Sequence, residues 1–239
     1  MIMATSAPIL LCAATKWEAE PLAAAFGLRR LGDFRFEGTV GGVDIVLLKT
    51  GIGAENARRA LATISAAEET VASNFSVPKM LISVGFAGAL QPKMDSGDLV
   101  LDVAGLDLSV PQTAREIAAS QNTPIHFGRI THSDKVLFNP KDKAALGQSA
   151  RAAAIDMESQ AIRAAAERLG VSFLAARVVL DAVDERLPSA VPAGESLSDL
   201  IPFVLKNATE LPLMLKVGLL QRSAITRLAS FLKELLPRL

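Results

Sequence analysis

The segment Val171-Ser-Phe-Leu-Ala-Ala-Arg-Val-Val-Leu-Asp181 decides the fold. Nearly all of its side chains are apolar, on both faces of an extended chain. Arg177 is the one charge inside it, and Asp181 ends it. Residues 155–169, just before it, have strong helical spacing that stops at Gly170. A strand that is apolar on both faces belongs inside a sheet that helices cover on both sides.

The same alternation extends along most of the chain. Strands are predicted at residues 9–14, 80–84, 98–103 and 171–180, with a hairpin at 39–48 around Gly41-Gly42; helices are predicted at 18–26, 54–70, 140–146 and 155–169. Residues 104–135 give no clear pattern. Strands and helices in this order predict a three-layer α/β/α fold with a central mixed, largely parallel, twisted sheet.

The chain length favours one domain over residues 1–239. Residues 186–195 hold two prolines and a glycine and are predicted to form a loop. Residues 197–239 are predicted to form an apolar, basic, helical C-terminal extension. Two interpretations of this extension stay open: its helices complete the core or an oligomer interface, or the last helix contacts a membrane surface.

Composition excludes several classes of function. The formal net charge is zero, which argues against general nucleic-acid binding, since that needs a basic field. Aromatic residues make up 5% of the chain and tyrosine is absent, which argues against stacking platforms for single strands. The lone Cys12 lies in an apolar run and favours a reducing compartment. With no signal-peptide pattern and no spanning run, we expect a cytoplasmic protein.

Polar and glycine-rich segments follow the predicted strands. Glu18 follows the first strand, the turn Gly51-Ile-Gly53 the hairpin, Gly85-Phe-Ala-Gly88 the next strand, and Asp181 the last. Ligands of open α/β sheets bind at the carboxyl ends of strands, so these groups are expected to meet at one edge. The glycine turn lacks a third glycine and no Walker pattern occurs, so no nucleotide cofactor is predicted.

The two histidines carry no predicted chemistry. Neither His126 nor His132 has metal-ligand spacing or a serine–acid pattern nearby. No metal is therefore predicted.

Four blocks of sequence carry a resemblance. They are Ala13-Ala-Thr-Lys-Trp-Glu18, Lys49-Thr-Gly-Ile-Gly53, Ser83-Val-Gly-Phe-Ala-Gly-Ala-Leu90 with Gly97-Asp98, and Ile155-Asp-Met-Glu-Ser159 with the stretch from Arg177 to Asp181. In this order they resemble the nucleoside phosphorylase and nucleosidase superfamily, of the purine and uridine phosphorylase type. The resemblance covers residues 9–184.

The resemblance implies an enzyme that cleaves the N-glycosidic bond of a purine nucleoside. Glu158 would accept hydrogen bonds from the ribose hydroxyls and stabilise oxocarbenium charge, with Met157 packed against the sugar. Asp181 would protonate the departing base, which requires a raised pKa. Glu18 would activate the attacking water.

The predicted site follows from these roles. Its catalytic residues are Glu18, Asp181 and Arg177, and its substrate-binding residues are Met157, Glu158, Phe86, Ala87, Gly88 and Phe138. Three residues of this region also have a purely structural interpretation. Arg177 either forms a buried ion pair or orients the carboxylates or the nucleophile. Asp181 would alternatively be a helix N-cap. Asp156 is predicted to be structural, because it would point away from Glu158 on a helix.

The residues favour hydrolysis over phosphorolysis. Phosphorylases of this superfamily carry an arginine before the glycine turn and a hydroxyl within it, where this chain has Ser83 and Phe86. A glutamate, Glu18, stands where nucleosidases have their base, and its charge would repel phosphate. Phosphorolysis stays the alternative, since Lys16 or Arg129 would supply positive charge.

The predicted substrate departs from the best-known members. Phe86 and Leu180 replace serines of the methylthioadenosine/S-adenosylhomocysteine nucleosidases and make the pocket more apolar. Residues 177–188 and the tail resemble the hopanoid-associated branch, which implies the lipid-linked nucleoside adenosylhopane. The opening block also resembles futalosine hydrolase. The partners expected are a small nucleoside, a second copy of the chain in a homo-oligomer, and, in the lipid-linked case, a membrane surface. A non-catalytic nucleoside-binding or membrane-surface protein on the same scaffold is the non-enzyme alternative.

Overall fold

The computed structural model describes residues 7–68, 77–185 and 211–239. The strands are β1 Ile9–Ala13, β2 Arg29–Arg30, β3 Arg35–Val40, β4 Val43–Lys49, β5 Met80–Ala89, β6 Leu99–Asp102, β7 Ile125–Phe127, β8 Ile130–His132, β9 Ala154–Asp156 and β10 Ser172–Asp181. The helices are α1 Lys16–Phe26, α2 Ala54–Glu68, α3 Ser109–Ser120, α4 Pro140–Ala150, α5 Ser159–Leu169 and α7 Leu211–Leu235, which a 3₁₀ turn, Leu236–Arg238, extends. The loop predicted at 186–195 lies outside the described residues.

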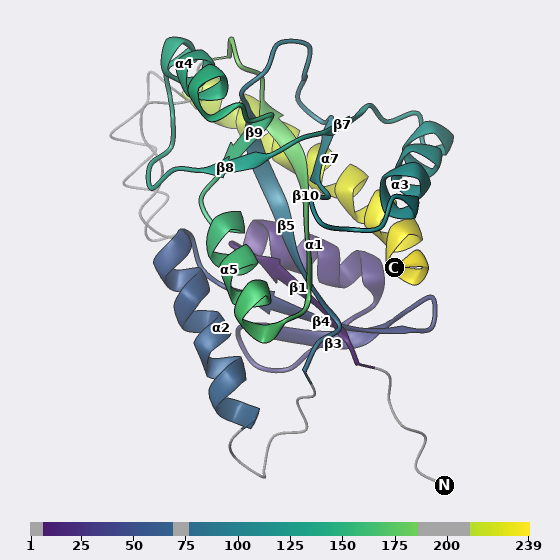
Figure 1. The fold of residues 1–239 in the computed structure, drawn as a ribbon. Helices are drawn as coiled ribbons and strands as arrows, with labels where there is room; N and C mark the ends of the chain where they lie inside the picture. Colours follow the sequence, from purple (N-terminus) through teal and green to yellow (C-terminus); the bar gives the residue numbers. More distant parts are fainter. Residues whose placement is uncertain (1–6, 69–76, 186–210) are drawn as a thin grey trace, which may run out of the picture.

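The strands of the described residues all belong to one mixed sheet, whose central strands Figure 1 shows. Its main order is β2-β3-β4-β1-β5-β10-β6-β7, with β9 paired to both β5 and β8. The central strands β4, β1, β5 and β10 are mutually parallel, whereas β6 is antiparallel to β10. Parallel central strands with antiparallel additions confirm the predicted mixed, largely parallel sheet.

Helices cover the sheet on both faces (Figure 1). The alternating side chains of β1 show the division, because Ile9 and Leu11 belong to the larger hydrophobic cluster and Leu10 and Cys12 to the other. The first cluster includes residues of α1, α3 and α7, and the second residues of α2 and α5. This arrangement confirms the three layers.

The described part of the C-terminal extension belongs to the core. Along α7 and the turn after it, the buried apolar side chains are Ala224, Ile225, Leu228, Ala229, Phe231, Leu232, Leu235 and Leu236. They pack with α1, α3 and the sheet in the larger cluster. For these residues the structure agrees with the core interpretation. Within the ranges described, no helix has the length and apolar character needed to span a membrane.

The helix predicted at residues 155–169 is wrong at its start. Ala154–Asp156 form strand β9, and α5 begins only at Ser159. The backbone of Ala154 and Ile155 pairs with Ala89 and Gly88 of β5, and strand pairing at long range overrides the local helical pattern. Asp156 therefore does not lie on a helix with Glu158.

Candidate active site

A cavity of about 220 Å³ opens at the carboxyl ends of β1, β5 and β10. Its lining residues are Ala14, Thr15, Glu18, Ile52, Phe86, Ala87, Gly88, Lys135, Val136, Leu137, Lys143, Ile155, Asp156, Met157, Glu158, Leu180 and Asp181. Residues that are far apart in the sequence thus meet at one sheet edge, as the strand pattern predicts.

Gly85 makes the centre of this site possible. It lies opposite Arg177 in the pairing of β5 with β10, and its φ is +137°. A Cβ at Gly85 would overlap the carboxylate of Glu18 and lie 2.8 Å from Arg177 Nη1. A glycine is therefore required for both its backbone conformation and the space beside it.

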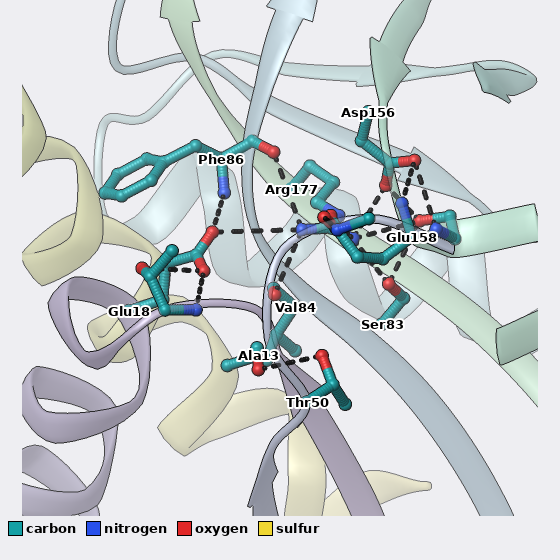
Figure 2. Close-up of polar contacts among 12 residues, drawn as sticks. Ala13, Glu18, Thr50, Ser83, Val84, Phe86, Asp156, Glu158 and Arg177 are labelled. Carbon is teal, nitrogen blue, oxygen red and sulfur yellow. Dashed lines mark hydrogen bonds and ion pairs between the residues drawn. The ribbon is translucent and has the colours of Figure 1, made fainter. Parts of the chain in front are cut away.

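The guanidinium of Arg177 is buried among carboxylates from several elements (Figure 2). Its Nη2 lies 2.7 Å from Asp156 Oδ2 and 3.7 Å from Glu158 Oε2, and its Nη1 lies 4.0 Å from Glu18 Oε1. It also donates to the Val84 carbonyl at 3.1 Å. One cation is thus shared by three buried carboxylates, and the cluster carries net negative charge when all three are ionised.

Two hydroxyls complete the network around Asp156. Arg177 Nη2 donates to Ser83 Oγ at 2.6 Å and to Ser159 Oγ at 3.2 Å. Ser159 Oγ lies 3.0 Å from Ser83 Oγ and forms a short hydrogen bond to Asp156 Oδ2. Asp156 Oδ1 accepts from the backbone N–H of Ser159 at 3.1 Å. Asp156 therefore fixes the start of α5, the segment that carries Glu158.

Glu18 is held by both of its oxygens. It occupies the third position of α1, and Oε2 accepts from the backbone N–H of Thr15 at 2.8 Å and from Thr15 Oγ1 at 3.0 Å. Oε1 accepts from the backbone N–H of Phe86 at 2.9 Å (Figure 2). The carboxylate is thereby fixed at the edge of the cavity.

Glu158 connects the cavity to the glycine turn after β4. Its Oε1 accepts from the backbone N–H of Gly53 at 2.7 Å. Burial raises the pKa of Glu158 to about 7, against the lowering effect of Arg177 and with further raising by Asp156 and Glu18. Glu158 therefore titrates close to neutral pH.

Asp181 faces a buried lysine. A β-bulge at Leu180 shifts the register, so that Val179 pairs with Ala87 and Asp181 with Gly88. Lys143 Nζ on α4 forms a short hydrogen-bonded ion pair with Asp181 Oδ2. Burial raises the pKa of Asp181 above its ordinary value, and the charge and hydrogen bond of Lys143 oppose that rise.

Most of the predicted site residues line this cavity, and two do not. Glu18, Phe86, Ala87, Gly88, Met157, Glu158 and Asp181 are among its lining residues. Arg177 lies behind the lining and contacts the carboxylates. The cavity is lined by Lys135, Val136 and Leu137 instead of Phe138, which directly precedes Asn139, the N-cap of α4.

Sequence reasoning missed Lys143 and placed Asp156 on the wrong kind of element. Asp156 was predicted to point away from the site on a helix, but a strand carries it into the Arg177 network. Lys143 shares one face of α4 with Leu146 and Gly147, at spacings of three and four residues. That spacing was the available signal that this lysine is turned inward.

The cations considered for phosphate binding lie elsewhere. Neither Lys16 nor Arg129 is among the residues that line the cavity. Arg129 lines a separate cavity with Arg163, which pairs with Asp102 at 2.7 Å. Among the charged residues that line the cavity at the strand ends, four are carboxylates and two are lysines.

Comparison with known proteins supplies the context of this site. The model of the Phosphorylase superfamily matches residues 8–104 and 103–211. The 5′-methylthioadenosine/S-adenosylhomocysteine nucleosidase of Actinobacillus succinogenes is 26% identical over 204 residues, covering 74% of this chain and 83% of the relative. The enzyme of the same name from an Exiguobacterium species is 27% identical over 177 residues, covering 63% and 72%.

Solved structures share the fold. Futalosine hydrolase of Helicobacter pylori superposes with a TM-score of 0.70 at 18% identity, covering 98% of both chains. The 5′-methylthioadenosine/S-adenosylhomocysteine nucleosidase of Neisseria meningitidis, solved in complex with methylthio-immucillin-A, gives a TM-score of 0.71 at 19% identity and covers 97% of this chain and 99% of its own.

Proposed function

Because the chain belongs to the phosphorylase superfamily, we propose that it hydrolyses the N-glycosidic bond of an adenosine-type purine nucleoside. One observation carries the proposal: Glu18, Glu158 and Asp181 line the same cavity from three different parts of the fold. The relatives that the sequence matches are themselves named nucleosidases, which supports the same class of reaction.

In this proposal Glu158 binds the sugar. Its carboxylate accepts hydrogen bonds from the vicinal hydroxyls and stabilises the positive charge that develops on the ribose as the bond breaks. Its bond from the Gly53 N–H leaves the second oxygen, Oε2, beside Arg177. Met157, which also lines the cavity, packs against the ribose.

Asp181 is the proposed acid for the leaving group. A purine leaves poorly as an anion, so a proton must reach a nitrogen of its five-membered ring. A Cβ at Gly88 would be 3.4 Å from both Asp181 oxygens, so the missing side chain leaves this face of the carboxyl uncovered. Raising the pKa of Asp181 by burial supports an acid role.

Glu18 is the proposed base for the attacking water. Oε2 of Glu18 accepts two hydrogen bonds from Thr15, and Oε1 accepts one from Phe86. Together these bonds fix the plane of the carboxylate. An oriented carboxylate at the cavity wall can accept a water proton while hydroxide attacks C1′. Arg177 acts through these carboxylates and is a positioning residue.

Charge favours water over phosphate as the nucleophile. Among the described residues that line the cavity, the cations are Lys135 and Lys143, and Lys143 already pairs with Asp181. Four carboxylates, those of Glu18, Asp156, Glu158 and Asp181, line the same space. A phosphate dianion would meet net negative charge there, whereas water would meet a base.

The test is base release from adenosine and 5′-methylthioadenosine with and without phosphate, with products separated by chromatography. We expect free base and free sugar in phosphate-free buffer. Formation of a sugar 1-phosphate that depends on phosphate would establish the phosphorolytic alternative. Tight binding of nucleosides with no base released would establish a binding protein.

Variants assign the roles. Asp181→Asn and Glu18→Gln should each lower kcat by about 10² or more, since each removes a proton-transfer group. Asp44→Asn is the control and should leave kcat unchanged, because Asp44 is a half-buried carboxylate of β4 that accepts from Thr39 Oγ1 at 3.2 Å and does not line the cavity. Full activity of Asp181→Asn would contradict the acid assignment.

The apolar part of the lining favours an apolar 5′ substituent. Ile52 is half exposed at the turn beside Glu158, and Phe86, Val136 and Leu180 add apolar surface. Adenosylhopane is the bulkiest such substrate that the sequence suggests, and futalosine and methylthioadenosine are the alternatives. A series of 5′-alkylthioadenosines should show kcat/KM rising with chain length, and Ile52→Ser should flatten that rise.

Oligomeric state and location belong to the same proposal. We propose a cytoplasmic homo-oligomer, with contact to a membrane surface if the substrate is lipid-linked. Leu219 on α7 is 73% exposed, and the basic Arg222 follows three residues later. An apolar side chain beside a basic one would suit contact with an anionic membrane surface. Light scattering will measure the oligomer, and flotation with anionic vesicles, comparing the unaltered chain with Leu219→Ser, will test the contact.

A further inference from the structure

Lys143 is the one lysine among the described side chains that is almost fully buried, with 1% of its surface exposed. It lines the same cavity as the proposed catalytic groups. Its Nζ donates to Asp181 Oδ2, to the carbonyl of Ala182 at 3.0 Å and to the carbonyl of Glu185 at 2.8 Å.

The packing of α4 brings Lys143 to this point. Gly147, one turn further along α4, lies against the Leu90 carbonyl at the end of β5, and a Cβ there would overlap that oxygen. Gln91 Nε2 donates to the carbonyls of Gly147 at 3.4 Å and Ala152 at 2.7 Å, which ties the end of α4 to the segment that follows β5. Lys143 is therefore carried by a docked helix and does not reach Asp181 as a flexible surface chain.

Three acceptors define the charge state of Lys143. A lysine amine offers two N–H donors when neutral and three when protonated. With three acceptor groups around Nζ, the protonated form alone satisfies all of them. Asp181 at rest is then the carboxylate partner of an ammonium ion, and it has no proton of its own for the departing base.

We propose that Lys143 supplies the proton which Asp181 delivers to the purine. This inference rests on the proposed function. In it, Lys143 and Asp181 form one buried couple that holds a single transferable proton, and Lys143 acts through Asp181 without contacting the base.

The steps balance. As the C1′–N bond breaks, its electron pair goes to the purine. A proton moves from Lys143 Nζ to the Asp181 carboxylate, and the carboxyl passes it to the imidazole-ring nitrogen of the base. Water gives hydroxide to C1′ and its other proton to Glu18. After the products leave, Glu18 releases one proton to solvent and Lys143 takes one up, so the enzyme is restored.

The test is the pH dependence of kcat/KM for Lys143→Met, with Lys141→Met as the matched control. Lys141 is an exposed lysine on the same helix. If the couple is the acid, removing the lysine leaves a lone carboxyl, which loses its proton at lower pH than an ammonium ion. The alkaline limb should then move down by about one pH unit or more. Lys141→Met should keep the limb of the unaltered chain.

Lys143→Arg separates proton supply from charge. Arginine keeps the positive charge, but its guanidinium does not give up a proton. The activity of Lys143→Arg at pH 8 should therefore be at least as low as that of Lys143→Met. Recovery of activity by arginine would overturn the proposal in favour of a purely electrostatic role. An upward shift of the alkaline limb in Lys143→Met, or no shift, would overturn it as well.

The unaltered chain gives a test that does not depend on variants folding. Ammonium groups release protons with a large enthalpy, and carboxyl groups with an enthalpy near zero. The pKa of the alkaline limb should fall clearly as temperature rises from 15 to ~35 °C, and an invariant pKa would contradict the couple. If the unaltered chain releases no base at all, the proposed function fails instead, so the two failures are distinct.

Discussion

Glu158 makes the stability of the folded chain depend on pH. Its pKa is raised to about 7 in the folded protein, mainly by burial, against an ordinary value near 4.5. The folded state thus binds this proton more tightly than the unfolded state does. Its contribution to stability is complete below about pH 4.5 and is lost as pH rises through 7.

Glu158→Gln should remove that dependence. The raised pKa of Glu158 corresponds to on the order of 3 kcal/mol between acid and alkaline conditions. The unaltered chain should lose stability between pH 5 and ~8, and the variant should lose less, measured as urea denaturation at several pH values. Parallel curves for the two proteins would show that Glu158 is charged throughout this range.

Gly85 is the residue at which local backbone and site geometry coincide. Gly85→Ala should both destabilise the chain and lower kcat, because alanine at φ +137° is strained and its Cβ overlaps Glu18. Gly42→Ala is the matched control, since Gly42 has φ +87° and nothing within 4 Å of a Cβ. The control should lose about 1 kcal/mol of stability and no activity. Equal kcat for both variants would show that Glu18 does not need this space.

At the scale of elements, the close contact of Gly147 with Leu90 helps to hold α4, and with it Lys143, at the site. Gly147→Ala should destabilise the chain and reduce activity, because the added Cβ overlaps the Leu90 carbonyl and moves the helix away from β5. Gly218→Ala on α7 is the same helical substitution with nothing within 4 Å. It should stabilise by up to about 1 kcal/mol. Thermal denaturation and kcat of both variants give the comparison.

The predicted helices and strands agree with the structure where the local hydrophobic pattern and the strand pairing favour the same element. Continuous apolar runs made the strands β1 and β10 predictable. The left-handed Gly27 marks the end of α1, and the left-handed Gly170 separates α5 from β10. The start of α5 was not, because β9 exists only through its pairing with β5 and β8. The Lys143–Asp181 pair joins residues 38 positions apart, and no local spacing encodes it.

The residues at the strand ends of the site were predictable from the sequence, whereas the contacts between them were not. Positions after strand ends identified Glu18 and Asp181 as neighbours, since a parallel sheet collects such residues at one edge. The partners of Arg177 were less accessible to prediction. They depend on Gly85 leaving room and on Asp156 lying in a strand, and both are facts of packing.

At the scale of the whole molecule, α7 is part of the hydrophobic core. Phe231→Ala should destabilise the chain by about 3–5 kcal/mol, because this side chain is fully buried between the sheet and its neighbouring helices. Leu219→Ala, at a position that is 73% exposed, should change stability by less than about 0.5 kcal/mol. Urea denaturation of both variants is the measurement. Similar small losses of unfolding free energy for the two variants would mean that the packing of α7 contributes little to the stability of the fold.

The position of β10 has a consequence for how the chain is made. β10 lies between β5 and β6, and its residues 172–181 are synthesised long after those of β5, 80–89. A nascent chain that has left the ribosome only as far as β5 and β6 therefore holds an unpaired, strongly apolar strand edge, which is a template for aggregation. A chaperone that covers this edge during translation should raise the yield of folded protein. A long translational pause before residue 172 should lower that yield, because it prolongs the exposure of the edge.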